Sequence, residues 1–171
     1  MRHFPSSVAT PPQRTSPVRG FQVLSYRDRP RLEAFFLAFD FSQRREYFGN
    51  CISDESIRDY CRAIHWSETT IIARSFGARL EAVATITATA SRRIAELSIA
   101  CAAECDRQST VSDLLDLSLT AASLNYMQLI VDYERAMPEL LALLHRSPFA
   151  VFDVDIVRVD VPCYSAKIVA C

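Results

Sequence analysis

Three apolar, β-branched segments that follow one another across short polar breaks constrain the fold of this chain most. The segments span 69–76, 79–89 and 94–102, and the breaks lie at 77–78 and 91–93. In the middle segment, valine and threonine alternate with alanine and isoleucine, which is the pattern of a strand. Breaks this short join antiparallel neighbours, because a parallel connection needs a much longer crossover. The centre of the chain is therefore predicted to be an antiparallel meander.

Helical periodicity dominates the residues that precede this meander. A short strand is predicted at 21–26, and two or three helices follow it. One helix spans 31–41, and another begins after Ser53, whose side chain is a suitable N-cap. The aromatic side chains of the first helix have helical spacing and are predicted to pack in the core: Phe35, Phe36, Phe39 and Phe41.

Helices and strands alternate after the meander. The pattern predicts a long helix opening at Thr110, a strand at 127–133, a helix at 136–145 and two closing strands at 149–152 and 155–161. Further predicted core residues are Cys61, Cys101, Leu114, Leu117, Ala121, Leu124, Phe149 and Phe152. A strand–helix–strand unit places one parallel pair in an otherwise antiparallel sheet. We therefore predict the α/β (α+β) class, with a mixed, mostly antiparallel twisted sheet of about seven strands and about four to five helices.

Composition limits the number of domains and the kinds of partner. A chain of 171 residues that is 50% hydrophobic can form one folded domain. We expect a disordered, proline-rich tail at 1–19, the domain at 20–162 and a C-terminal extension at 163–171. A net charge of -1 argues against a nucleic-acid partner, and no apolar run is long enough for a membrane span. Because no export signal is recognisable, we expect a cytoplasmic protein.

Glycine, cysteine and histidine restrict the chemistry further. The chain has only 3 glycines, although phosphate-binding loops use glycine to bring the backbone close to the ligand. None of the 6 cysteines forms a C-x-x-C pair, so we expect no disulfide framework. The 3 histidines lie far apart in the sequence, and we expect no metal site.

Four segments of this sequence carry a resemblance to a known family. The residues AELSIACAAECDRQSTVSDLL, 95–115, resemble the fourth strand, the acyl-coenzyme A loop and the third helix of the GNAT (Gcn5-related) N-acetyltransferases. The residues YERAMPELLALLHRSPF, 133–149, resemble its N-x-A-x-x-L-Y-x-x-x-G-F region. The segments FSQRREYFG and SDESIRDY are similar to the N-terminal helices of GNAT domains in bacterial protein-lysine acetyltransferases. The resemblance covers roughly 20–162 and agrees with the predicted order of elements.

This resemblance implies acetyl transfer from acetyl-coenzyme A to an amine acceptor of unknown identity. Glu96 corresponds to a catalytic glutamate and would act as general base. The edge of the strand at 97–102 would hold the pantetheine, and the helix N-terminus that follows would bind the pyrophosphate through backbone amides. The residues that this assigns to the coenzyme are Ile99, Cys101, Arg107, Gln108, Ser109, Thr110, Val111 and Ser112.

The same alignment also shows departures from the family pattern. Ser109 and Val111 replace the two glycines of the loop, and the branched side chain of Val111 is expected to crowd a phosphate. Leu144 stands at the position of the tyrosine that serves as general acid in the family, and Glu134 replaces the family's asparagine. The alternative for the loop is that Thr110 merely caps the helix.

Two functions therefore remain open from the sequence. The first is an N-acetyltransferase, and the second is a degenerate GNAT-like module that acts in protein interaction or regulation. The coenzyme loop decides between them, since only the first function needs its amides free. A homodimer is also left open.

Overall fold

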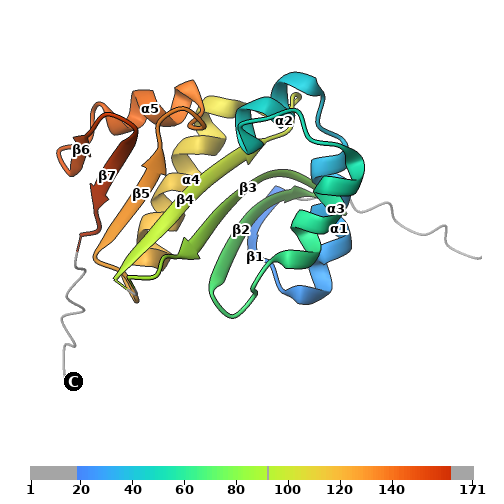
Figure 1. Cartoon of the computed structure of the whole chain (residues 1–171), viewed down its shortest axis with the longest axis horizontal. Helices are drawn as coiled ribbons and strands as arrows, with labels where there is room; N and C mark the ends of the chain where they lie inside the picture. The colour runs from blue at the N-terminus through green and yellow to red at the C-terminus, as the bar shows by residue number, and fades with distance from the viewer. Residues whose placement is uncertain (1–18, 92, 163–171) are drawn as a thin grey trace, which may run out of the picture.

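A seven-stranded sheet forms the centre of the molecule, in the order β1-β2-β3-β4-β5-β7-β6 (Figure 1). The computed structural model describes residues 19–91 and 93–162. The strands are β1 (Arg19–Val23), β2 (Thr69–Phe76), β3 (Arg79–Ala88), β4 (Ile94–Cys101), β5 (Gln128–Asp132), β6 (Ala150–Phe152) and β7 (Ile156–Asp160). The helices are α1 (Arg29–Leu37), α2 (Phe41–Phe48), α3 (Asp54–Ala63), α4 (Arg107–Ala122) and α5 (Pro138–Leu144), with a 3-10 turn, η1, at Tyr26–Asp28.

The prediction of a mixed, mostly antiparallel sheet is confirmed. Within the described ranges, β4 and β5 form the one parallel pair, and the other neighbouring strands are antiparallel. The parallel pair is short. Its register runs only from Ile94 opposite Gln128 to Glu96 opposite Ile130. Beyond that point β4 continues to Cys101 without pairing to β5, so the two strands diverge.

Two hydrophobic cores flank the sheet. On one face, α4 and α5 cover alternate residues of the central strands, among them Leu97 and Ile99. On the other face, α1, α2 and α3 surround Phe36, which contacts the rings of Phe35 and Tyr47 at centroid distances of 5.2 and 4.9 Å. Cys61 and Cys101 are buried, as predicted. The sheet therefore separates two layers of helices, each with a hydrophobic core of its own.

The predicted helix at 31–41 is wrong at its end. The helix α1 ends at Leu37, and Asp40 begins α2 by accepting a hydrogen bond from the Gln43 amide at 2.9 Å. The Gln43 side chain returns a hydrogen bond to the Asp40 amide, which completes a capping box. Phe41 consequently leaves the core and is 67% exposed.

Other predictions fail at the edges of elements. Leu117, Leu124 and Phe149 are exposed rather than buried, and Leu124 lies beyond the end of α4. Tyr26 belongs to η1, because β1 ends at Val23. Arg19 is the first residue of β1 rather than part of a tail. Residues 1–18 and the predicted C-terminal extension at 163–171 lie outside the described residues.

No helix of the described part of the chain is both long and apolar enough to cross a membrane.

Candidate functional site

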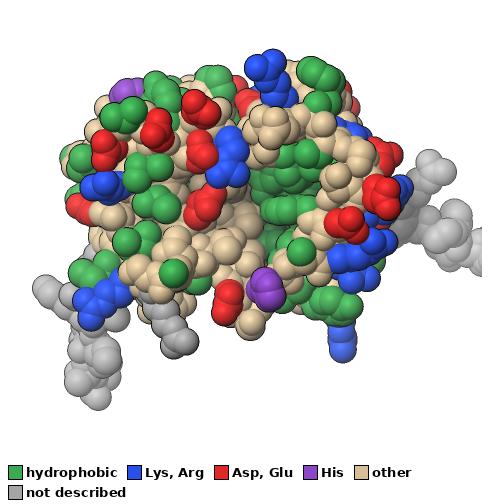
Figure 2. Space-filling model, viewed as in Figure 1, with side chains coloured by type: hydrophobic (Ala, Val, Ile, Leu, Met, Phe, Trp, Pro, Cys, Tyr) green, Lys and Arg blue, Asp and Glu red, His purple; other side chains and the backbone are tan. Residues whose placement is uncertain are grey.

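A cavity of about 300 Å³ lies on the face of the sheet that α2 and α3 cover. The space-filling view shows this face hollowed between the two groups of helices, with acidic and basic side chains beside the hollow (Figure 2). Three aromatic rings, two threonines, a serine and one ion pair line the cavity: Tyr47, Phe48, Tyr60, Thr85, Thr87, Ser98, Glu96 and Arg135. We call it the Glu96 pocket.

Glu96 lines this cavity beside Ser98, but its carboxylate is not free. Arg135, which follows β5, donates to Glu96 at 3.0 Å and to Asp132 at 2.6 Å. The Glu96 and Arg135 side chains are each 40% exposed. Burial alone would lower the pKa of Arg135, but Asp132 and Glu96 outweigh it and raise that pKa. Two carboxylates thus share one guanidinium, and the cluster carries a net negative charge.

Two phenols line the same cavity, that of the buried Tyr47 and that of the half-buried Tyr60. The Tyr47 hydroxyl lies 3.3 Å from the Tyr60 hydroxyl and 3.3 Å from the Thr85 hydroxyl. Burial raises the pKa of Tyr47 and, more strongly, that of Tyr60, so both phenols stay protonated at neutral pH. The pocket therefore offers ring faces, neutral hydroxyls and one exchangeable carboxylate.

The residues predicted to bind coenzyme A lie at the first turns of α4, and here the predicted cap is wrong. The helix begins at Arg107, and the N-cap is Asp106, whose carboxylate accepts from the Ser109 amide at 3.4 Å. The Thr110 amide donates to the Asp106 carbonyl at 3.0 Å. Within this first turn the chain's own carboxylate therefore holds the Ser109 amide, and the capping group is an anion.

Arg107 is the cation nearest to this helix start, and it is committed to two carboxylates. It donates to Glu46 of α2 at 2.8 Å, and its Nε lies 3.3 Å from Glu139 of α5. Burial would lower the pKa of Arg107, but Glu46 and then Glu139 raise it. The three side chains connect α2, α4 and α5 across the opening between β4 and β5.

The remaining predicted loop residues separate into exposed and buried groups. Gln108 and Ser109 are exposed, and Ser112 is half-buried in the second turn. Thr110 is fully buried, and its hydroxyl accepts from Arg74 of β2. Val111 is also fully buried in the core. The expectation that Val111 crowds a phosphate is therefore wrong, because its side chain packs into the core.

The gap between the diverging strands is filled. Ile99 and Cys101 of β4 are buried, and they meet Met137, which is 2% exposed, around a residual cavity of only about 10 Å³. Gln43 donates to the Cys101 carbonyl at 3.1 Å. Burial raises the pKa of Cys101, so its thiol stays neutral. This backbone edge was predicted to hold pantetheine, and Met137 and Gln43 now occupy it.

The structure thus splits the predicted site into three parts. Glu96 faces the cavity, Ile99 and Cys101 face the opposite core, and Arg107 to Ser112 belong to α4. Leu144, at the position of the family's tyrosine, is 1% exposed, and Glu134 is on the surface. Sequence reasoning missed Tyr47, Tyr60 and Arg135, which carry no local motif. The N-cap Asp106 had a readable signal, since aspartate is among the best capping residues.

Several solved structures are similar to this chain over most of its length. The GNAT domain of S. lividans PAT matches 81% of this chain and 87% of its own, at 14% identity and a TM-score of 0.61. A phosphinothricin acetyltransferase from Sinorhizobium meliloti, in complex with AcCoA, matches 84% and 88%, at 14% identity and a TM-score of 0.62. A spermidine N-acetyltransferase from Vibrio cholerae, in complex with CoA and spermine, matches 82% and 92%, at 15% identity and a TM-score of 0.58.

No family model matches the sequence, and no curated protein matches it. The assignment therefore comes from the arrangement of elements: the seven-stranded order, the single parallel pair and its divergence beyond Glu96. The solved acetyltransferases agree with this chain over more than four-fifths of its length. The chain has the fold of the GNAT superfamily.

Proposed function

We propose that this chain is a non-catalytic GNAT-fold module that binds a small organic amine in the Glu96 pocket and does not use acetyl-coenzyme A. The observation that carries the proposal is the closed start of α4. Asp106 holds the Ser109 amide, and Glu46 and Glu139 hold Arg107. A pyrophosphate at this place would meet three carboxylates and one guanidinium that is already paired. At an effective dielectric constant of about 20, each like-charge contact at 4 Å costs about 4 kcal/mol.

The groups that acetyl transfer requires are also engaged or absent. A general base must accept the proton of the amine, and Glu96 would first have to leave its ion pair with Arg135. A general acid is missing at Leu144, which packs in the core. Met137 and Gln43 occupy the strand edge along which the thioester would have to lie. Loss of one of these features would be tolerable, but here they are lost together.

The amine is supported by the groups that remain in the Glu96 pocket. Glu96 and Asp132 share Arg135, so one negative charge is in excess. The rings of Tyr47, Phe48 and Tyr60 line the cavity and offer π faces to a cation. A half-exposed ion pair is worth at most about 1 kcal/mol, so an ammonium group can displace Arg135 from Glu96 at small cost.

The test is calorimetric titration of the folded protein with spermidine and with acetyl-coenzyme A. We expect spermidine to bind and the Glu96→Gln variant to lose most of that binding. The matched control is Asp116→Asn on the exposed face of α4, which should bind as the wild type does. Acetyl-coenzyme A should give no heat and no release of free thiol. Micromolar binding of acetyl-coenzyme A would overturn the proposal.

An N-acetyltransferase is the second candidate, and the divergence of β4 and β5 beyond Glu96 favours it. It requires Met137 and Arg107 to move away from the strand edge. Thiol release from acetyl-coenzyme A in the presence of spermidine, abolished by Glu96→Gln, would support this candidate. Spermidine binding without thiol release supports the non-catalytic module instead.

A further inference from the structure

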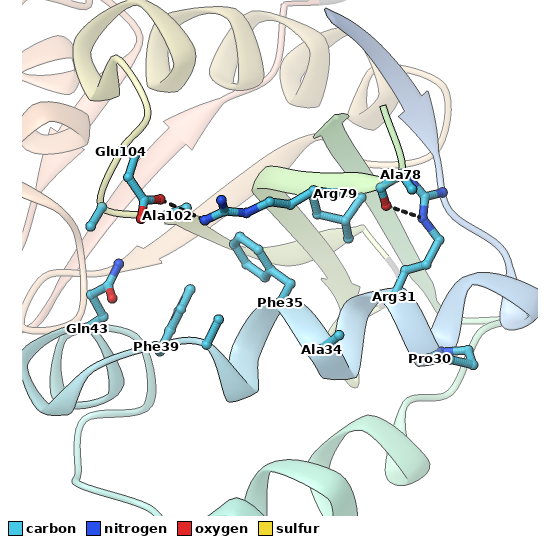
Figure 3. A pocket seen from close by; sticks show the side chains of 13 residues that line it. Pro30, Arg31, Ala34, Phe35, Phe39, Gln43, Ala78, Arg79, Ala102 and Glu104 are labelled. Carbon is cyan, nitrogen blue, oxygen red and sulfur yellow. Dashed lines mark hydrogen bonds and ion pairs between the residues drawn. The ribbon is translucent and has the colours of Figure 1, made fainter. Parts of the chain in front are cut away.

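A second cavity, of about 470 Å³, lies between α1, the turn that joins β2 to β3, and the loop that joins β4 to α4 (Figure 3). None of its lining residues lines the Glu96 pocket. We call it the α1 groove. Cavities of this size accommodate small organic ligands.

The floor of the α1 groove is apolar. Phe35, Phe39 and Leu80 are buried beneath it. Ala34 of α1 and its C-cap residue Ala38 are exposed and one helical turn apart, and their small side chains leave room above this floor. The groove therefore follows the helix and suits an elongated hydrocarbon better than a compact polar molecule.

Charged side chains border this floor, and one of them already holds a carboxylate. Arg79 of β3 reaches across the groove to Glu104 at 2.7 Å, as Figure 3 shows. Arg31 lies toward the opposite end, where it donates to the Ala78 carbonyl at 3.2 Å and to Asp28 at 3.1 Å. Each arginine thus has one carboxylate partner.

The Arg79–Glu104 ion pair is easy to exchange. Its side chains are 63% and 71% exposed, and pairs this exposed contribute little to stability. A ligand carboxylate that replaces Glu104 keeps the charge-assisted hydrogen bond to Arg79. Such a ligand also buries its apolar body on Phe35 and Phe39, which the Glu104 side chain does not do.

We propose that the α1 groove binds a medium-chain aliphatic carboxylate, with its carboxylate on Arg79 and its chain along Ala34 and Ala38. The site is independent of the Glu96 pocket, because the two share no residue. Failure of the amine proposal would therefore leave this one standing.

The test compares decanoate, decanol and decylamine, each below its micelle-forming concentration, by titration followed with amide NMR shifts. We expect decanoate to bind about tenfold more tightly than decylamine, with the largest shifts in α1 and at 102–104. Arg79→Gln should lower the affinity for decanoate about tenfold and leave the affinity for decanol unchanged. Glu104→Gln should raise the affinity for decanoate several-fold, because it removes the carboxylate that pairs with Arg79. Arg62→Gln, a surface arginine paired with Asp59, is the matched control and should change nothing.

A steric block completes the design. Ala34→Phe should abolish binding of all three probes, and Ala38→Phe replaces it if Ala34→Phe lowers the melting temperature. The Glu96→Gln variant should bind decanoate as the wild type does. Equal affinity for decanoate and decylamine, shifts outside the groove, or no gain with Glu104→Gln would each overturn the proposal.

Discussion

Arg107 of α4 donates to Glu46 of α2 at 2.8 Å, and this pair joins two helices through residues that are 61 positions apart in the sequence. Glu139 of α5 lies 3.3 Å from the same guanidinium, so Arg107 links α4 to both α2 and α5. Beyond Glu96 the strands β4 and β5 diverge, and side chains rather than strand pairing fill the space beside β4. Closure by side chains, rather than by strand pairing, can be tested one residue at a time.

The strength of this closure is measurable by a double-mutant cycle. Arg107→Gln and Glu46→Gln, separately and combined, should give a coupling free energy of about 0.5–1 kcal/mol, because both side chains are about two-thirds buried. The measurement is urea unfolding. The control cycle is Arg62 with Asp59, an exposed pair on α3 at 2.9 Å, which should couple more weakly. A coupling no larger than the control would mean that Arg107 does not hold α2 in place.

The capping role of Asp106 predicts how much stability each of three variants loses. Asp106→Ala should lower the free energy of unfolding by about 0.5–1 kcal/mol, at the low end for an N-cap because the bond to Ser109 is long at 3.4 Å. Asp106→Asn should lose less, since an amide oxygen can cap as well. Asp113→Ala is the control, an exposed residue two turns into α4. Equal losses in Asp106→Ala and Asp113→Ala would contradict the assignment.

The order of elements could be predicted from the sequence because period and turn chemistry agree over most of the chain. Strand alternation at 79–89 and the short breaks beside it determine the meander, and the structure confirms them. The join between α1 and α2 was missed because Phe35 to Phe41 continue the helical spacing. Asp40 followed by Gln43 was the capping signal that could have located it.

The site was less predictable, for a physical reason. Asp106 and Thr110 are both suitable caps, and the resemblance favoured a loop that ran through Asp106. The partners of Arg107 lie on α2 and α5, and no local pattern connects residues that only tertiary packing brings together. Glu96 was assigned from the family resemblance. Strand alternation predicted that it shares a face with Ser98, away from Leu97 and Ile99, and the structure places it with Ser98 in the lining of the cavity.

Placing a tyrosine at Leu144, where the family has one, should not produce acetyl transfer. Leu144 is 1% exposed, so Leu144→Tyr adds bulk and an unpaired hydroxyl to a packed core and should cost about 1–3 kcal/mol. It should not release thiol from acetyl-coenzyme A. Leu124→Tyr, at a position that is 82% exposed, is the control and should stay within about 0.5 kcal/mol of wild type. A Leu144→Tyr protein with wild-type stability and acetyl transfer would show that the position is catalytic.

The buried phenols of the Glu96 pocket predict how stability depends on alkaline pH. Burial raises the pKa of Tyr47 and of Tyr60 in the folded state, while phenols of the unfolded chain ionise near about 10. Above that pH the unfolded state binds fewer protons than the folded state, so stability falls as pH rises. Below it, the contribution is fully present.

The measurement is the urea midpoint between neutral pH and pH about 11, together with phenolate absorbance of the folded protein. Tyr60→Phe should flatten the alkaline loss, because it removes the phenol with the more strongly raised pKa. Tyr133→Phe is the matched control, since Tyr133 is exposed on the surface and its replacement should leave the alkaline loss of stability unchanged. If the wild type and Tyr60→Phe lose stability in parallel, the Tyr60 hydroxyl ionises at the same pH in the folded protein as in the unfolded chain. The wall of the Glu96 pocket would then be open to water rather than dry.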